Sequence, residues 1–207
     1  MISIIRNNQY SNTYIIERFN ICYIVDPSDD LEDILERIGE KEVVGVLLTH
    51  AHYDHTRLIS KFKVPVYVHS LDAALLFEDD LNGYSISGTK RPFSRKELDL
   101  ELINDGDSLP IADHYIKVIY TPGHTKGSVS YLYQDKLISG DTLFEGGIGR
   151  TDFPSGNTYE MRKSIVNLID DLDGNVKVFP GHGISTTIRN ERKNNPYYLK
   201  WVKQVKK

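Results

Sequence analysis

Short apolar runs broken by polar turn residues occupy the first 26 positions of the chain. The runs ISIIR, NTYIIERF and ICYIVD are separated by Asn-rich and Ser-rich segments, which predicts a meander of three short strands. We expect these strands at residues 2–6, 12–19 and 21–26. Cys22 lies inside the third apolar run and is therefore expected to be a buried strand residue.

The period of the apolar pattern changes after residue 26. Leu31, Ile34 and Leu35 recur at helical spacing, the segment DPSDD before them supplies capping residues, and Gly39 stops the pattern. These signals predict a helix over 31–39. The apolar run EVVGVLLTH follows as a predicted strand, and it ends on a dense group of histidines.

Strand and helix patterns continue along the rest of the chain. In the middle we expect a helix at 55–62, a strand at 64–69, a helix at 71–78 and a polar loop at 81–96 that could cover a site. Later we expect strands at 98–103, 114–120, 128–133, 136–139 and 175–179, a helix at 158–172 and a helical tail. Strands early and late in each half, with helices outside them, predict two sheets packed face to face.

Composition and charge narrow the class of protein. With 207 residues, 40% of them hydrophobic, the chain can form one sizeable core, and one domain is expected. A net charge of −4 provides no basic field for a nucleic acid. A single cysteine excludes an intrachain disulfide, and the apolar start is too short for a signal sequence or membrane span. We therefore expect a cytoplasmic protein with neither nucleic acid nor membrane as a partner; the sequence specifies no oligomeric state.

The segment THAHYDH, Thr49 to His55, concentrates four candidate metal ligands. Side chains two residues apart diverge in a helix, so His50 and His52 share a ligand only if the backbone is extended there, as it is at the end of a strand. Asp54 and His55 then lie where the next helix would begin. One turn thus presents two pairs of ligands, which indicates more than one metal ion.

Three further candidate ligands occur at comparable places later in the chain. His124, Asp141 and His182 each follow an apolar strand pattern and each is preceded by glycine, which permits a sharp turn at a strand end. A lone pair of histidines is common on protein surfaces, but this complete set indicates a metal centre. Imidazole and carboxylate suit zinc, iron or manganese. His69 and His114 lack such partners and are expected to be structural or exposed.

The blocks THAHYDH, TPGHTKGS, SGDTLFEGGIGRTDF, FPGHG and TTIRNERKNNP carry a family resemblance. The sequence resembles the metallo-β-lactamase superfamily and, within it, the short bacterial hydroxyacylglutathione hydrolases, which are glyoxalase II-like proteins. The resemblance implies an α+β fold, an αββα four-layer sandwich formed by residues 1–207 as one domain. The separate C-terminal helical substrate domain of the longer enzymes is expected to be absent.

The resemblance also implies roles for the seven candidate ligands. Carried over by position, one metal ion is bound by His50, His52 and His124, the other by Asp54, His55 and His182, with Asp141 bridging. The expected cofactors are two divalent metal ions, zinc foremost, with iron or manganese as alternatives. Asp54 and Asp141 are the implied catalytic carboxylates, and a hydroxide between the metals is the implied nucleophile.

The implied substrate is a thioester such as S-lactoylglutathione. A thiol with a pKa of about 8.5 leaves as a thiolate, so no dedicated general acid is needed, and the motifs contain no obvious one. Arg150 matches the position of a basic residue near the glutathione carboxylate; the alternative is a structural pair with Asp152. Because no tyrosine follows His182, Arg192 and Lys193 are further candidates for binding substrate, with a solvated helix face as the alternative.

Three other functions stay open at this stage. Persulfide dioxygenases share the scaffold and a similar GRTDF block but use a single iron, so metal count and oxygen consumption separate them from hydrolases. A phosphodiesterase or other esterase of the superfamily is disfavoured, for phosphate esters, by the acidic charge balance. A metal-binding module without catalytic activity would be favoured by a missing ligand, and none is missing.

Overall fold

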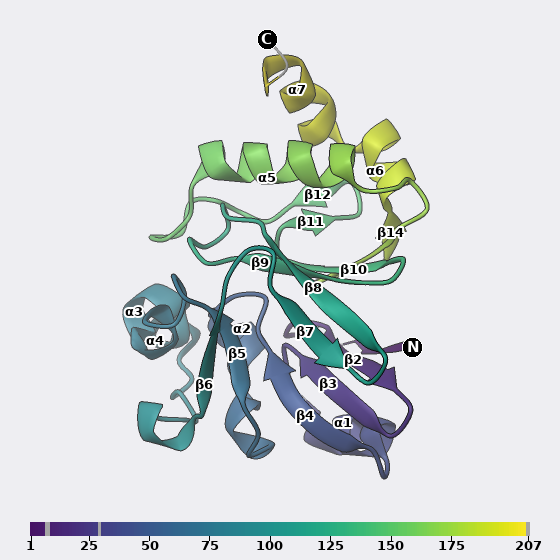
Figure 1. The fold of residues 1–207 in the computed structure, drawn as a ribbon. Helices are drawn as coiled ribbons and strands as arrows, with labels where there is room; N and C mark the ends of the chain where they lie inside the picture. Colours follow the sequence, from purple (N-terminus) through teal and green to yellow (C-terminus); the bar gives the residue numbers. More distant parts are fainter. Residues whose placement is uncertain (7–8, 29, 206–207) are drawn as a thin grey trace.

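Two six-stranded sheets face each other across the centre of the structure, a computed structural model that describes residues 1–6, 9–28 and 30–205 (Figure 1). The first sheet has the order β1-β2-β3-β4-β5-β6. Its first three strands are antiparallel and its last four are parallel, because short turns join the former and crossovers join the latter. The strands are β1 (Ile2–Ile5), β2 (Thr13–Arg18), β3 (Ile21–Val25), β4 (Glu42–Leu47), β5 (Val66–His69) and β6 (Leu100–Ile103).

The second sheet has the order β14-β13-β10-β9-β8-β7, and only the pair of β10 and β13 is parallel. A separate hairpin, β11 paired with β12, follows β10 in the chain. The strands are β7 (Ser108–Ile111), β8 (His114–Tyr120), β9 (Val129–Tyr133), β10 (Lys136–Gly140), β11 (Leu143–Phe144), β12 (Gly147–Ile148), β13 (Lys177–Pro180) and β14 (Thr186–Thr187).

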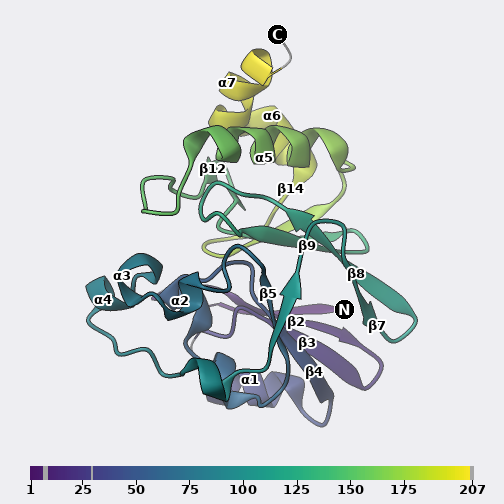
Figure 2. The same ribbon diagram turned by 60° about the vertical axis from the view of Figure 1, so that its left-hand side comes forward.

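Helices cover the outer faces of both sheets, so the layers follow the expected αββα order (Figures 1 and 2). Helix α1 (Leu31–Ile38) lies on the first sheet. Helices α5 (Thr158–Asp171) and α6 (Ile188–Asn194) lie on the second sheet, and α7 (Pro196–Val205) packs on these two helices (Figure 1). Three apolar cores result, one between the two sheets and one between each sheet and its helices.

Strand β2 shows how the sequence places a strand between two cores. Alternate residues of a strand point to opposite faces. Tyr14 and Ile16 pack into the core between the sheets, whereas Ile15 packs toward the helical side. Each fully buried aliphatic side chain contributes roughly 1.5–3 kcal/mol relative to exposure. The strand is therefore apolar on both faces and reads as a continuous apolar run. Cys22 on β3 is fully buried, as expected.

The segment between β4 and β6 departs from the predicted helices. The helix expected at 55–62 is instead α2 (Tyr53–Thr56) and a 3₁₀ turn at Ile59–Lys61, and the one expected at 71–78 is reduced to a 3₁₀ turn at Leu75–Phe77. The buried amide of Asn82 donates to Leu75 O at 3.0 Å and Leu76 O at 3.1 Å, which uses the carbonyls that a continuing helix needs.

The predicted loop at 81–96 contains more structure than expected. It includes the end of α3 (Asp79–Asn82), all of α4 (Tyr84–Ser87) and a 3₁₀ turn at Arg95–Glu97. Strand β7 was not predicted, because Pro110 interrupts its short pattern; it is an edge strand, where proline is tolerated. Asp30 caps α1 through Asp33 N; Asp29, the other predicted capping aspartate, lies outside the described residues. Among the described residues, no helix is long and apolar enough to cross a membrane.

Candidate metal centre

All seven predicted ligands lie at one edge of the two sheets. The first sheet supplies four of them, from the loop after β4 and from α2, and the second sheet supplies three, from the segments after β8, β10 and β13. Their ligand atoms form three overlapping groups, each spanning no more than 4.8 Å. These groups are His50, His52 and His124; His50, His55 and Asp141; and Asp54, His55 and His182.

The first group is almost completely buried. The Nδ1 atom of His52 lies 2.8 Å from Nε2 of His124, and the rings of both lie within 4.8 Å of the His50 ring, measured between centroids. These two nitrogens are within hydrogen-bonding distance of each other, and each of the three histidines offers a ring nitrogen within 4.8 Å of those of the other two. The group therefore presents three nitrogens to one small volume.

Asp141 links this group to the second one. Its Oδ2 lies 3.6 Å from Nε2 of His124 and 3.6 Å from Nε2 of His182, while its Oδ1 lies 3.4 Å from Nε2 of His55. Asp54 Oδ2 lies 3.2 Å from His182 Nε2. The carboxylate of Asp141 thus lies between both sets of histidines, at the position that a bridging ligand requires.

Glycine precedes three of the ligands for two different reasons. Gly123 and Gly140 have φ of +141° and +49°, so they make the sharp turns that the sequence predicted. Gly181 has no positive φ, but a Cβ there would lie 2.1 Å from Asp141 Oδ1. The sequence prediction of a turn is therefore right at two positions, whereas the third glycine keeps space free beside Asp141.

Asp26 at the end of β3 orients two ligands, and the sequence analysis missed it. Its Oδ2 accepts hydrogen bonds from His55 Nδ1 at 2.9 Å and from Thr49 Oγ1 at 2.6 Å. His50 Nδ1 lies 3.1 Å from the same Thr49 oxygen. These bonds place the protons on Nδ1 and leave the Nε2 lone pairs of both histidines free for a metal ion. A polar residue ending an apolar strand was the available signal.

Asp72 is a second buried carboxylate that the sequence analysis missed. It accepts hydrogen bonds from Ala51 N at 3.0 Å, Gly127 N at 2.7 Å and Thr125 Oγ1 at 2.8 Å. It therefore joins the loop of His50 and His52 to the loop that follows His124. The hydroxyl of Thr125 thus has a structural role in this contact.

The electrostatics of the cluster favour neutral imidazoles beside a charged carboxylate. Burial, followed by the neighbouring His124, lowers the pKa of His52 to about 3, and burial also lowers the pKa of His50 well below its usual range. Burial opposes ionisation of Asp141, but His55 and the other facing histidines hold its pKa below the usual range. His50 and His52 thus present unprotonated nitrogens beside the anionic carboxylate of Asp141.

The pKa of His55 indicates that its surroundings favour a positive charge. Although burial opposes its charged form, Asp141 and Asp26 raise the pKa of His55 well above the usual value. The site therefore stabilises a positive charge between Asp141 and His55, and a divalent cation supplies that charge when the imidazole is neutral.

Unpaired buried atoms provide the test of fit for metal ions. Within the described residues, Nε2 of His50, Nε2 of His55 and Oδ1 of Asp141 are buried without a hydrogen-bond partner. Such groups are costly unless another partner satisfies them. Their convergence at the Asp141 carboxylate shows that the donor set fits divalent metal ions.

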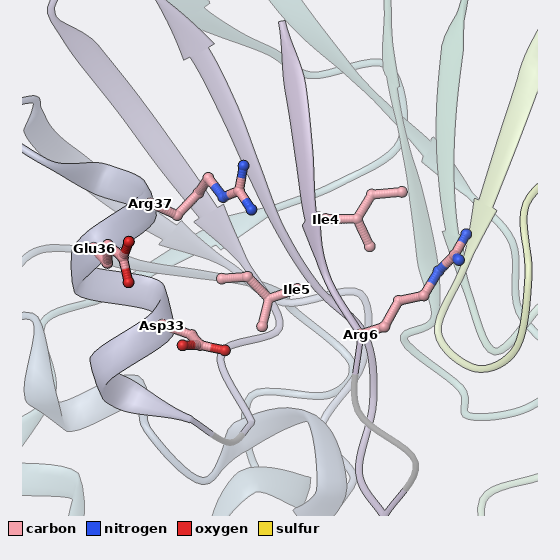
Figure 3. Close-up of a pocket in the computed structure, with 6 residues that line it drawn as sticks. All are labelled: Ile4, Ile5, Arg6, Asp33, Glu36 and Arg37. Atoms are coloured by element: carbon pink, nitrogen blue, oxygen red, sulfur yellow. The ribbon is translucent and has the colours of Figure 1, made fainter.

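A cavity of about 690 Å³ opens directly on the ligands. It is lined by His52, Tyr53, Asp54, Asp80, Leu81, Asn82, Gly83, Ile86, Ser87, His124, Asp141, Phe144, Arg150, Phe153, Pro154 and His182. A second cavity, of about 440 Å³, lies between β1 and α1 and exposes both acidic and basic side chains (Figure 3). Its lining residues include no histidine, so it is not part of the metal centre.

Arg150 lines the cavity and is also paired with Asp152, so the features expected from both interpretations of this residue are present. Its guanidinium donates to both carboxylate oxygens of Asp152, at 2.7 and 2.8 Å, and lies 4.2 Å from the centroid of the Phe153 ring. Its side chain is 59% exposed, and its backbone oxygen accepts from His124 Nδ1 at 2.8 Å. Arg150 is thus paired with Asp152 and is also open to the cavity.

Arg192 and Lys193, predicted as candidates for binding substrate, are not among the described residues that line this cavity. The Arg192 guanidinium donates to Ile169 O at 3.2 Å and to Leu172 O at 2.8 Å, at the carboxyl end of α5. A cation there offsets the partial negative charge of the helix end. Lys193 is exposed on α6, in agreement with the alternative of a solvated helix face.

A buried carboxylate in α6 fixes one wall of the cavity. Glu191 accepts hydrogen bonds from Thr186 Oγ1 at 2.7 Å, Asn195 Nδ2 at 2.9 Å and Gly146 N at 2.9 Å. Gly146 lies in the turn of the β11–β12 hairpin, which carries Phe144 into the cavity. Through Glu191, the block TTIRNERKNNP therefore supports the hairpin.

Comparison of the sequence with protein families gives a match to the family described as the metallo-β-lactamase superfamily over residues 6–182. The probable metallo-hydrolase YqgX of Bacillus subtilis is 36% identical over 90% of this chain and 92% of its own. The hydroxyacylglutathione hydrolase GloC of Haemophilus influenzae is 31% identical over 84% of this chain and 85% of its own.

Solved structures agree with the fold. The crystal structure of the BLEG-1 B3 metallo-β-lactamase aligns with a TM-score of 0.86 and 35% identity, covering 96% of this chain and 99% of that one. The crystal structure of TTHA1623 in a di-iron-bound form aligns with a TM-score of 0.83 and 29% identity, covering 94% of this chain and 99% of that one.

Proposed function

The chain belongs to the metallo-β-lactamase superfamily and is a metal-dependent hydrolase, and from this premise we propose that it cleaves thioesters of the S-2-hydroxyacylglutathione type. S-lactoylglutathione is the reference substrate. One observation carries the proposal: the cluster of seven histidine and aspartate side chains borders a cavity of about 690 Å³, where Arg150 is the only arginine or lysine among the described lining residues.

We assign the metal ligands as two sets that share Asp141. His50, His52 and His124 would hold one ion, Asp54, His55 and His182 the other, and the Asp141 carboxylate would contact both. When bound, two divalent ions supply a nucleophile at neutral pH and polarise a carbonyl oxygen. We propose zinc, with iron as the main alternative because the related TTHA1623 is described in a di-iron-bound form.

The surrounding residues keep the ligands in the required state. The bond from His55 to Asp26 and the contact of His50 with Thr49 hold the protons on Nδ1, away from the centre. The anionic Asp141 offsets the charge of the cations. The chain's contribution to catalysis is therefore the positioning of neutral nitrogens and of two carboxylates, Asp54 and Asp141, around the reacting carbonyl.

The leaving group favours a thioester over an amide. A thiol with a pKa of about 8.5 departs as a thiolate at neutral pH, whereas an amine leaving group needs a proton. We assign Arg150 to a carboxylate on the thiol half, since its guanidinium is open to the cavity. The 31% identity with the hydroxyacylglutathione hydrolase GloC supports the proposed substrate class.

β-Lactam hydrolysis is the second candidate function. It is favoured by the 35% identity with the BLEG-1 B3 metallo-β-lactamase over nearly the whole of both chains. The leaving nitrogen of a β-lactam needs protonation, and we assign no cavity residue to that task. We therefore place β-lactams below thioesters.

Purified protein should be analysed for metal content and assayed in parallel with S-lactoylglutathione, a chromogenic cephalosporin and glutathione persulfide. We expect about two metal ions per chain and release of free thiol from the thioester without oxygen consumption. One tightly bound iron with oxygen uptake on the persulfide would replace the proposal by a dioxygenase. Preferential turnover of the cephalosporin would replace it by a β-lactamase.

A further inference from the structure

A large apolar side chain stands exposed at the mouth of the metal-site cavity. Ile86 on α4 is 76% exposed, the highest exposed fraction among the large hydrophobic residues described. It lines the same cavity as the ligands, with Leu81 of α3 beside it in the lining. An isoleucine left in water at a binding cavity gains free energy when a ligand covers it.

The wall that carries Ile86 is firmly fastened to the ligand helix. Tyr84, on the same helix, is buried and its hydroxyl lies 3.2 Å from Thr56 Oγ1 on α2, next to His55. The rings of Tyr84 and Tyr53 pack edge to face at 5.9 Å. Asn82, which is fully buried, accepts from Tyr84 N at 3.1 Å. The inner side of the wall is thus fixed, and Ile86 is presented outward.

Arg150 and Phe153 face this wall from another segment of the chain. The loop between β12 and α5, which carries both residues, projects on the same side of the molecule as α3 and α4 (Figure 2). Phe153 packs on His52 at 5.1 Å between ring centroids. The cavity therefore has a cationic, aromatic side near His52 and a side formed by α3 and α4 that carries two aliphatic residues, Leu81 and Ile86, together with the polar residues Asp80, Asn82 and Ser87.

We propose that the wall formed by Leu81 and Ile86 binds the acyl half of the substrate, and that this acyl group is an aliphatic chain longer than lactoyl. The inference rests on the proposed thioesterase function. The two halves of a thioester extend in opposite directions from its carbonyl carbon. With the carbonyl at the ligands and the charged thiol half at Arg150, the acyl chain lies against the aliphatic wall.

Chain-length dependence of hydrolysis tests this assignment. We would compare acetyl, butanoyl, hexanoyl and octanoyl thioesters of glutathione with wild type and with Ile86→Ser. In the wild type, kcat/KM should rise with chain length by up to about fourfold per methylene group until the wall is covered. In Ile86→Ser this rise should be flattened, so that the loss is larger for octanoyl than for acetyl thioester.

The matched control is Leu35→Ser, which exchanges an exposed aliphatic residue of α1 outside the cavity. It should keep the wild-type dependence on chain length, and all three proteins should hold the same amount of metal. Equal slopes for wild type and Ile86→Ser, or a wild type that is indifferent to chain length, would overturn the proposal.

A binding measurement separates failure of the wall from failure of the thioesterase function. Aliphatic carboxylates from butanoate to octanoate resemble the acyl product and can be titrated calorimetrically into the metal-loaded protein. Tighter binding of octanoate, lost in Ile86→Ser, supports the wall even if no thioester is turned over. Octanoate binding that is unchanged by Ile86→Ser overturns it, whatever the assays with thioesters give.

Discussion

The floor of the cavity, formed by the predicted metal ligands, and its rim, formed by Arg150 and Ile86, are built in opposite ways. On the floor, His50, His52, His55 and His124 are buried. The hydroxyl of Thr49, the carboxylate of Asp26 and the carbonyl of Arg150 orient the rings of His50, His55 and His124, respectively. On the rim, Arg150 and Ile86 are mostly exposed, and Arg150 has its charge paired with Asp152. The floor holds one arrangement, whereas the rim can adapt to what it binds.

This difference separates chemistry from selectivity. A change on the floor leaves a buried polar group unpaired, so its cost falls on metal binding and on every substrate. A change on the rim replaces a side chain that is already solvated and leaves no buried group unpaired. Its cost therefore depends on the contacts that a given substrate makes with that side chain. The following predictions test this contrast, beginning with the floor.

Asp141→Asn should have the largest effect. The change keeps the shape of the side chain but removes the charge that lies between the histidines of both groups. We expect metal content and turnover to fall together. The loss should exceed the roughly 10–100-fold decrease that is typical when a residue bonded to a metal ligand, rather than the ligand itself, is changed. Metal analysis and kcat/KM, measured on the same sample, check this. Full metal content with full activity would remove Asp141 from its bridging role.

Asp26→Asn should be next in size. The change removes the negative acceptor of His55 Nδ1 and Thr49 Oγ1, so two ligands lose their fixed orientation. Metal affinity should fall by about 10–100-fold while the fold is kept, as measured by competition with a chelator. Asp113→Asn, which changes an exposed carboxylate paired with Arg18, serves as the control and should leave metal affinity unaltered.

Arg150→Ala should affect only substrates with a carboxylate on the thiol half. We expect KM for S-lactoylglutathione to rise by about tenfold, the lower end for a charge-assisted contact, because the guanidinium is 59% exposed. A simple thioester without that carboxylate should lose far less. Asp152→Asn releases the guanidinium and should not raise KM. Equal losses for both variants and both substrates would indicate a structural ion pair.

The ion pair between Arg150 and Asp152 should have the smallest effect. It should appear only as a pH dependence of the Tm. The Arg150 guanidinium lowers the pKa of Asp152 to about 2, below the ordinary value of 3.8. A lowered pKa in the folded state stabilises the protein above pH 3.8, and this contribution is lost as the pH falls toward 2. The Tm difference between wild type and Asp152→Asn should therefore be small at neutral pH and vanish near pH 2. A difference that grows on acidification would contradict this.

The ligand positions were accessible from the sequence because each interrupts a strong local pattern. His124 and Asp141 follow glycine at the end of an apolar strand, and the structure brings both into the cluster. Asp26 follows a strand as well, but its neighbours suggested a turn before a helix, and its partners Thr49 and His55 are distant in sequence. Contacts of this kind follow from the arrangement of the sheets and leave no local periodicity.

The long elements of the fold could also be predicted from the sequence, whereas the short ones could not. The long strands and α5 have apolar patterns that agree with their burial, and the expected αββα layers are confirmed. The helices α3 and α4 have four residues each, too few for a helical period to be visible. Residues 71–78 have a helical pattern, but they form only turns and the 3₁₀ turn at Leu75–Phe77. The buried amide of Asn82 then binds the carbonyls of Leu75 and Leu76, a contact that the apolar pattern does not indicate.

Glu191 also fixes an order of events during synthesis. The residue follows every proposed ligand in the chain, yet its carboxylate holds the turn at Gly146 in the hairpin that carries Phe144. Until Glu191 has been synthesised, the backbone N–H of Gly146 lacks its native acceptor. The cavity wall therefore reaches its final form only after α6 has left the ribosome, when the first sheet, whose last strand ends at Ile103, has had time to fold.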